Sequence, residues 1–116
     1  MISKETKLMQ KVQPEFPISV YPEKDILPKL HENFEDESIS LKTELEIHAM
    51  YDMGVEGGLT CEIRTKGLDT QAAKTVFLCS ITHFRIKRGE PFYHDLEKYQ
   101  LKRIRKLARQ NRNRRF

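Results

Sequence analysis

The stretch Leu41-Lys-Thr-Glu-Leu-Glu-Ile-His-Ala-Met-Tyr-Asp-Met53 alternates between apolar and polar side chains. Residues two apart lie on the same face of a β-strand, so this period predicts a long strand with one face toward the core and one toward water. The face expected to be buried carries Leu41, Thr43, Leu45, Ile47, Ala49, Tyr51 and Met53. Such a strand decides the fold class, because it needs neighbouring strands and a covering layer.

The neighbouring sequence supplies further strands. Gly54-Val-Glu-Gly-Gly58 indicates a reversal of the chain, and alternation resumes over residues 59–64. A third long strand is expected over residues 76–87, after a looser connection over residues 67–74. The first half of this third strand is apolar on both faces, which favours a central or covered position. Residues 16–20 are a candidate for a fourth, short strand.

Two helices are expected to flank the sheet. Residues 25–34 predict a short helix with Asp25 as its N-cap and Pro28 in its first turn. Its buried side would carry Ile26, Leu27, Leu30 and Phe34. Gly89-Glu-Pro91 ends the sheet and opens the last helix, whose apolar residues fall on one stripe. That stripe consists of Tyr93, Leu96, Leu101, Ile104, Leu107 and Ala108, and we expect it to pack on the sheet.

These elements predict an α+β protein. It would have a short N-terminal helix, an antiparallel sheet of three to four strands, and a C-terminal amphipathic helix packed on one face. Residues 1–14 have no clear period and are expected to form a loosely held arm. Residues 15–109 would form a single domain, and residues 110–116 a basic tail.

The order of a helix, three antiparallel strands and a helix is similar to that of the double-stranded-RNA-binding domain, over roughly residues 25–110. That family opens its last helix with a Gly- and Lys-rich loop and has an Ala-rich face along the helix. Here the corresponding loop is Lys87-Arg-Gly-Glu-Pro-Phe92 and the helix face is Leu and Ile. Membership is therefore not inferred, and cystatin-like and other small sheet-plus-helix folds fit the period equally well.

The net charge of +4 hides a strong asymmetry along the chain. Residues 1–84 contain nine Lys and Arg against fourteen Asp and Glu, whereas residues 85–116 contain twelve against three. An acidic body joined to a basic end creates a directional field that attracts polyanions to one end of the molecule.

The basic residues of the last helix fall on the arc opposite its apolar stripe and continue into the tail. We predict that this surface binds nucleic acid through phosphates, because a dense run of fixed positive charge releases condensed counterions. RNA is favoured over DNA, since the tail is rich in Arg and Asn and the chain has no helix-turn-helix or zinc pattern. The predicted contact residues are Lys98, Lys102, Arg103, Arg105, Lys106, Arg109, Arg112, Arg114 and Arg115.

A protein-interaction or assembly factor, docking through its acidic body and basic tail, is the alternative. Its mark would be an exposed apolar patch, either Phe92, Tyr93 and Tyr99 or Phe77 and Ile81.

Other function classes find little support in the chain. We expect no enzyme, no cofactor and no metal site, since His31, His48, His83 and His94 lack ligand spacing and the glycines lack a phosphate-loop pattern. The carboxylates Glu44, Glu46, Asp52 and Glu62 could meet on one strand face, but neighbouring cations can pair with them. Cys61 and Cys79 are expected to be reduced thiols, and the polar first residues and the lack of a long apolar run favour a cytoplasmic protein.

Overall fold

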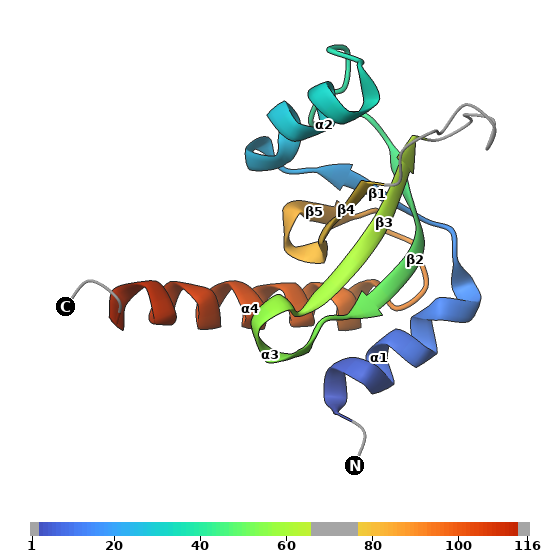
Figure 1. Ribbon diagram of the computed structural model, residues 1–116. Helices are drawn as coiled ribbons and strands as arrows, with labels where there is room; N and C mark the ends of the chain where they lie inside the picture. Colours follow the sequence, from blue (N-terminus) through green and yellow to red (C-terminus); the bar gives the residue numbers. More distant parts are fainter. Residues whose placement is uncertain (1–2, 66–76, 114–116) are drawn as a thin grey trace.

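The computed structural model describes residues 3–65 and 77–113, without the side chains of residues 55–56 and 111–113. The predicted connection over residues 67–74 and the predicted contact residues Arg114 and Arg115 lie outside these ranges. The elements are α1 (Lys4–Val12), β1 (Ile18–Pro22), α2 (Leu27–Phe34), β2 (Leu45–Asp52), α3 (Gly54–Gly57), β3 (Leu59–Thr65), β4 (Phe77–Ser80), β5 (Phe84–Ile86) and α4 (Tyr93–Asn113) (Figure 1). Three short 3-10 turns join them, namely η1 (Gln13–Glu15), η2 (Lys24–Ile26) and η3 (Ile81–His83).

The predicted α+β class is confirmed, but the sheet has five strands instead of three or four. Its order is β4-β3-β2-β1-β5 and the paired strands are antiparallel. The two edge strands, β4 and β5, follow each other in the chain and are joined only by η3. The sheet therefore curls until its two edges approach each other, so that its inner face encloses the core (Figure 1). This arrangement also differs from the helix, three-strand, helix order considered above.

The predicted third strand is one chain segment bent into two strands. The 3-10 turn at Ile81–His83 interrupts it, and the Ser80 hydroxyl caps the turn by accepting the Thr82 N–H. Because the turn breaks the period of two, Ile81 and Phe84, on opposite faces of a straight strand, are both buried. Leu78, which the period places with Phe84, is 52 % exposed instead.

A β-bulge in β2 changes the predicted buried face of this strand. Ile47 pairs with Ile63 and Ala49 with Glu62, so His48 is an extra residue on the β2 side. Leu45 and Ile47 before the bulge are buried as predicted, but after it Met50 points into the core. Tyr51 and Met53, which were expected to be buried, are 47 % and 61 % exposed.

Helix α2 has the predicted location and covers one end of the core. Pro28 lies in its first turn, and Ile26 and Leu30 are buried. Asp25 does not cap the helix as predicted. Its carboxylate lies 2.9 Å from Nδ1 of His83, which connects η2 to η3 across the sheet edge.

Residues 1–14, which have no clear period in the sequence, contain helix α1. The Ser3 hydroxyl caps the helix by accepting the Thr6 N–H. Val12 at its last turn is fully buried, and Leu8 and Met9 pack against the core. Within the described residues, no helix is long and apolar enough to cross a membrane.

Helix α4 packs on the sheet with a different face from the predicted one. Its buried residues are Leu96, Gln100 and Arg103, whereas Leu101 and Ile104 of the apolar stripe are 49 % and 47 % exposed. Gln100 explains the rotation, because its amide Nε2 donates to the carbonyls of Ile81 (2.8 Å) and Phe84 (2.6 Å). These two carbonyls lie at the turn that joins β4 and β5, so α4 holds the turn through hydrogen bonds. The C-terminal half of α4 projects past the strands (Figure 1).

Candidate functional site

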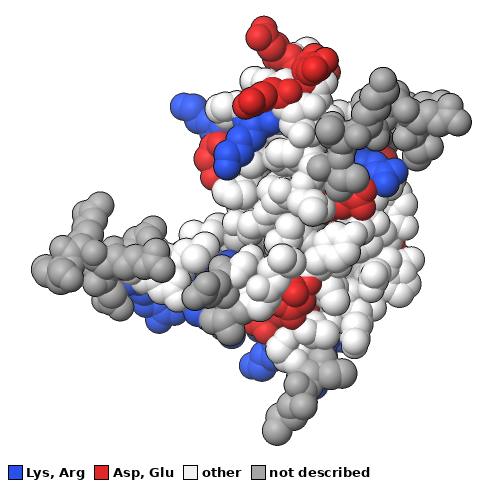
Figure 2. Space-filling model, in the orientation of Figure 1, with Lys and Arg blue, Asp and Glu red and all other residues white. Residues whose placement is uncertain are grey.

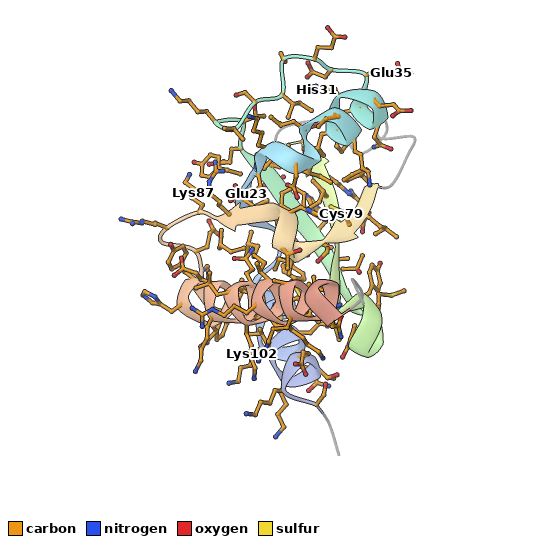
Figure 3. The ribbon with its side chains drawn as sticks, turned by 90° about the vertical axis from the view of Figure 1, so that its left-hand side faces the viewer. Glu23, His31, Glu35, Cys79, Lys87 and Lys102 are labelled. Atoms are coloured by element: carbon orange, nitrogen blue, oxygen red, sulfur yellow. The ribbon has the colours of Figure 1, made fainter. Side chains whose placement is uncertain are left out.

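The basic residues gather on one side of the molecule, where α1 and α4 lie next to each other. Helix α1 carries three lysines at spacings of three and four residues, which places them on one helix side. Lys102 lies on the side of α4 where α1 is found (Figure 3). We call this the two-helix basic surface, and its members are Lys4, Lys7, Lys11, Lys98, Lys102, Arg105, Lys106 and Arg109.

A groove of about 330 Å³ runs between the two helices. Five lysines line it, namely Lys4, Lys7, Lys11, Lys98 and Lys102. The only carboxylates among the described lining residues are Glu5 and Asp95. Five lysines against two carboxylates give the groove lining a net positive charge.

Asp52 connects α1 to the sheet and so positions its lysines. The Thr6 hydroxyl donates to the Asp52 carboxylate at 2.6 Å, and the Gly54 N–H donates to the other carboxylate oxygen at 2.9 Å. These two hydrogen bonds, the one from Thr6 first, hold the pKa of Asp52 below its ordinary value. The ionised carboxylate is thus the form that connects α1 to β2.

The predicted contact residues do not all reach solvent. Lys98, Lys102, Arg105 and Arg109 are exposed and Lys106 is half-buried. Arg112 lies in the last turns of α4, where the side chains are not described. Sequence reasoning missed the contribution of α1, although the spacing of Lys4, Lys7 and Lys11 was a visible signal of a basic helix side.

Arg103 has a packing position and is only 8 % exposed. A Cβ atom on Gly58 would lie 3.0 Å from its Nε and 2.7 Å from the Tyr99 hydroxyl oxygen. Gly58 also has a φ of +65°, which L-residues with side chains rarely adopt. The Tyr99 hydroxyl in turn accepts the Leu59 N–H at 2.9 Å. Arg103 and Tyr99 therefore seat α4 on the turn before β3.

A second groove, of about 1130 Å³, lies on the other side of α4. One wall is the uncovered part of the apolar stripe, Leu101, Ile104, Leu107 and Ala108. The opposite wall comes from the β1 end, η2, η3 and β5, and includes Tyr21, Glu23, Asp25, His83 and Arg85. We call this the α4 apolar groove. Glu23 and Lys87 lie above α4 and Lys102 below it in Figure 3, so the two grooves flank opposite sides of the helix.

The aromatic residues expected to mark a protein-docking patch are not the exposed ones. Phe77, Phe92, Tyr93 and Tyr99 are half-buried and Ile81 is fully buried. The large apolar residues of α4 that are exposed, among those described, are Leu101 and Ile104 instead.

Several titratable residues elsewhere are engaged in local pairs. His31 Nε2 lies 2.6 Å from the Ile39 carbonyl oxygen, and His48 Nε2 lies 3.2 Å from a Glu46 carboxylate oxygen. The remaining carboxylates of the predicted set are also paired, Glu44 with Lys87 at 2.6 Å and Glu62 with Arg64 at 2.9 Å. Among the described residues, no three His, Cys, Asp or Glu residues are grouped so that they could hold a metal ion.

Cys61 and Cys79 face each other across β3 and β4, and both are free thiols. Burial raises the pKa of Cys61 well above its usual range and that of Cys79 to about 12. Both thiols are therefore protonated at neutral pH and poor nucleophiles.

Comparison of the chain with protein-family models, with characterised proteins and with solved structures gives no match. The two surfaces that flank α4 are therefore the candidate functional sites of the protein.

Proposed function

We propose that the protein binds nucleic acid, RNA in preference to DNA, through phosphate contacts made by the two-helix basic surface and the basic tail. The observation that carries this proposal is the groove lined by five lysines from two helices. It continues the exposed arc formed by Arg105 and Arg109 on α4. Surface lysines scattered singly would carry no such argument, whereas lysines converging from separate elements create a local positive potential.

The gain in free energy would come mainly from counterion release. Each phosphate neutralised by a lysine or arginine frees a condensed cation, so binding is strong at low salt and weakens steeply as salt rises. Lysine side chains on an exposed helix side are suited to phosphates, so contacts to the backbone would dominate and sequence preference would be weak. Arginine and asparagine in the tail favour RNA, because arginine forks match phosphates and stack on unpaired bases.

The acidic residues would orient the encounter. Glu32, Glu35, Asp36 and Glu37 belong to α2 and the segment after it, at the end of the molecule far from α4 (Figure 1). In Figure 2 acidic side chains gather at this end, and basic side chains lie along the lower edge of α4. A polyanion would be repelled at one end and attracted at the other, so the basic surface would lead the approach.

Binding to unrelated RNA sequences, measured by fluorescence anisotropy over a salt series, tests the proposal. Replacing Lys4, Lys7 and Lys11 together by alanine should lower the slope of log affinity against log salt by roughly 0.7–0.9 for each phosphate that is no longer neutralised. The matched control replaces Lys24, Lys29 and Lys42, three exposed lysines remote from this groove, and should leave the slope unchanged. If both triple variants lower the slope equally, the protein attracts RNA through its net charge alone, and the two-helix basic surface is not a binding site.

A deletion tests the tail separately. Removing residues 110–116 should weaken binding to unrelated RNA sequences by similar factors and reduce the salt slope. The melting temperature should barely change, because the last buried or half-buried residue described in α4 is Leu107. If the shortened protein binds RNA as before, with the same salt dependence, the tail has no part in binding.

The second candidate function is an assembly factor that docks on a protein. The α4 apolar groove favours it, since exposed apolar stripes with polar rims commonly mark interaction sites. If Leu101→Glu abolishes binding to a protein partner, and the unaltered chain binds no RNA, this candidate is favoured over the first.

A further inference from the structure

A separate pocket opens from the lysine-lined groove where α1, α3 and α4 meet. Its volume of about 350 Å³ is at the small end of the range for ligand pockets, so it has room for one sugar and its phosphate. Glu5, Tyr99 and Lys102 line both the groove and this pocket, which we call the α1/α4 pocket. A nucleic-acid strand that lies along the groove therefore passes the mouth of the pocket.

Two charged residues of the α1/α4 pocket are held by the fold. The Asp52 carboxylate accepts hydrogen bonds from the Thr6 hydroxyl and the Gly54 N–H. Arg103 is only 8 % exposed and lies beside Gly58. These two side chains shape the pocket, and we assign neither of them to a ligand.

The other three charged side chains of the pocket are Glu5, Lys102 and Lys106, and within the part of the chain that the structure describes they make no hydrogen bond or ion pair. Lys102 and Lys106 are four residues apart, so they lie on one side of α4. Glu5 comes from α1 and is half-buried. Burial raises the pKa of the Tyr99 hydroxyl, and the charges of Glu5 and Asp52 raise it further because both carboxylates lie near it. The pocket thus has two cations on its α4 side and a carboxylate on its α1 side.

This combination of charges suits a sugar-phosphate unit better than a plain anion. A carboxylate among phosphate-binding lysines repels a polyanion, and a ligand offsets that cost if it donates a hydrogen bond to the carboxylate. The ribose 2′-hydroxyl is such a donor, it belongs to the backbone beside the phosphates, and DNA lacks it. A hydrogen bond to an ionised carboxylate is also stronger than one between neutral groups.

We propose that the α1/α4 pocket holds one ribonucleotide of the bound strand, with Lys102 and Lys106 on its phosphate and the Glu5 carboxylate accepting a hydrogen bond from its 2′-hydroxyl. This inference rests on the nucleic-acid function proposed above and adds to it a residue that distinguishes RNA from DNA. The lysines supply affinity for either nucleic acid, whereas Glu5 favours RNA.

The first test uses the unaltered chain and three single strands of one sequence, made of RNA, of DNA and of 2′-fluoro RNA. The 2′-fluoro strand keeps the sugar shape of RNA but has no hydroxyl to donate. By fluorescence anisotropy at one salt concentration, RNA should bind about tenfold more tightly than the 2′-fluoro strand. Equal affinities for these two strands would overturn the inference and leave the proposed function standing. A chain that binds none of the three strands would overturn both.

The second test assigns the effect to Glu5. Glu5→Ala removes the acceptor, so RNA and the 2′-fluoro strand should bind equally, and the affinity for DNA should rise because a repelling charge is gone. Asp95→Ala is the matched control, because Asp95 also lies in the first turn of its helix and lines the groove, but not the pocket. This control should raise the affinity for all three strands by the same factor. If Glu5→Ala does the same, Glu5 only repels phosphates and the inference is wrong.

The third test concerns the phosphate half of the site. Lys106 lines the pocket but not the groove, so Lys106→Ala should lower the salt slope for RNA by roughly 0.7, the value for one phosphate contact to a single strand. Lys24→Ala, at an exposed lysine that lines neither of them, is the control and should leave the slope unchanged. An unchanged slope for the Lys106 variant would place the phosphate outside the pocket and overturn the proposal.

Discussion

The two halves of α4 have the same amphipathic period but different surroundings. In the first half, Leu96 is fully buried and Gln100 donates to two carbonyls of the η3 turn. In the second half, Ile104 and Ala108 are exposed and face a groove. A period thus shows that a helix has an apolar face, but not how much of that face the same chain covers.

The largest difference between the halves should appear on truncating Leu96. Leu96→Ala leaves a cavity between α4 and the core, so the free energy of unfolding should fall by ~2–5 kcal/mol. Urea denaturation followed by circular dichroism measures this change. Leu101→Ala is the same chemical change at a half-exposed position and should cost less than ~1 kcal/mol. Similar losses for the two variants would contradict the described rotation of α4.

Gln100→Ala should have the next largest effect. It leaves the carbonyls of Ile81 and Phe84 without their amide donor in a buried place, which costs about 1–3 kcal/mol. Gln110→Ala, at an exposed position of the same helix, is the control and should change the unfolding midpoint little. If the two variants are equally stable, hydrogen bonding to the η3 turn does not fix the helix.

Acid should loosen α1 from β2 before it affects the core. The pKa of Asp52 is lowered in the folded state, so its contribution to stability is present above the ordinary value of 3.8 and is lost as the pH falls through the lowered value. Amide hydrogen exchange over α1 should therefore accelerate at the acid end of this range. Asp52→Asn should show fast exchange at neutral pH already, and unchanged protection in that variant would exclude the carboxylate as the connection.

The smallest effect on folding is expected at Ile104. Ile104→Ala should change the free energy of unfolding by less than ~1 kcal/mol in dilute protein, because about half of this side chain already contacts water. A large loss under dilute conditions would mean that the second half of α4 packs on its own chain.

Much of the fold was visible in the sequence. Alternation located β2 and β3, and Pro28 with its apolar neighbours located α2. Two interruptions of the strands were not visible in the sequence, namely the bulge at His48 and the η3 turn. Each changes which strand face is buried, but the residues that form it have ordinary strand propensity, so the pattern gives no sign of it. As a result Met50 is buried, whereas Tyr51 and Leu78 are exposed.

The candidate site was predicted only in part, for a related reason. Charge counting identified the basic arc of α4, including Lys98 and Lys102, since net charge along the chain needs no coordinates. It could not show that Arg103 lies against Gly58, or that the lysines of α1 line the same groove, because both depend on contacts between distant residues.

The sequence alone thus determined the α+β class, the location of most elements and the separation of an acidic body from a basic end, since these follow from local period and composition. The tertiary structure decided which side of α4 is buried. Hydrogen bonds from Gln100 to η3 and from the Leu59 N–H to Tyr99 fix that rotation, and they join segments that are distant along the chain. An apolar period is compatible with several rotations of a helix, and specific polar contacts select one of them, which here leaves Leu101 and Ile104 uncovered.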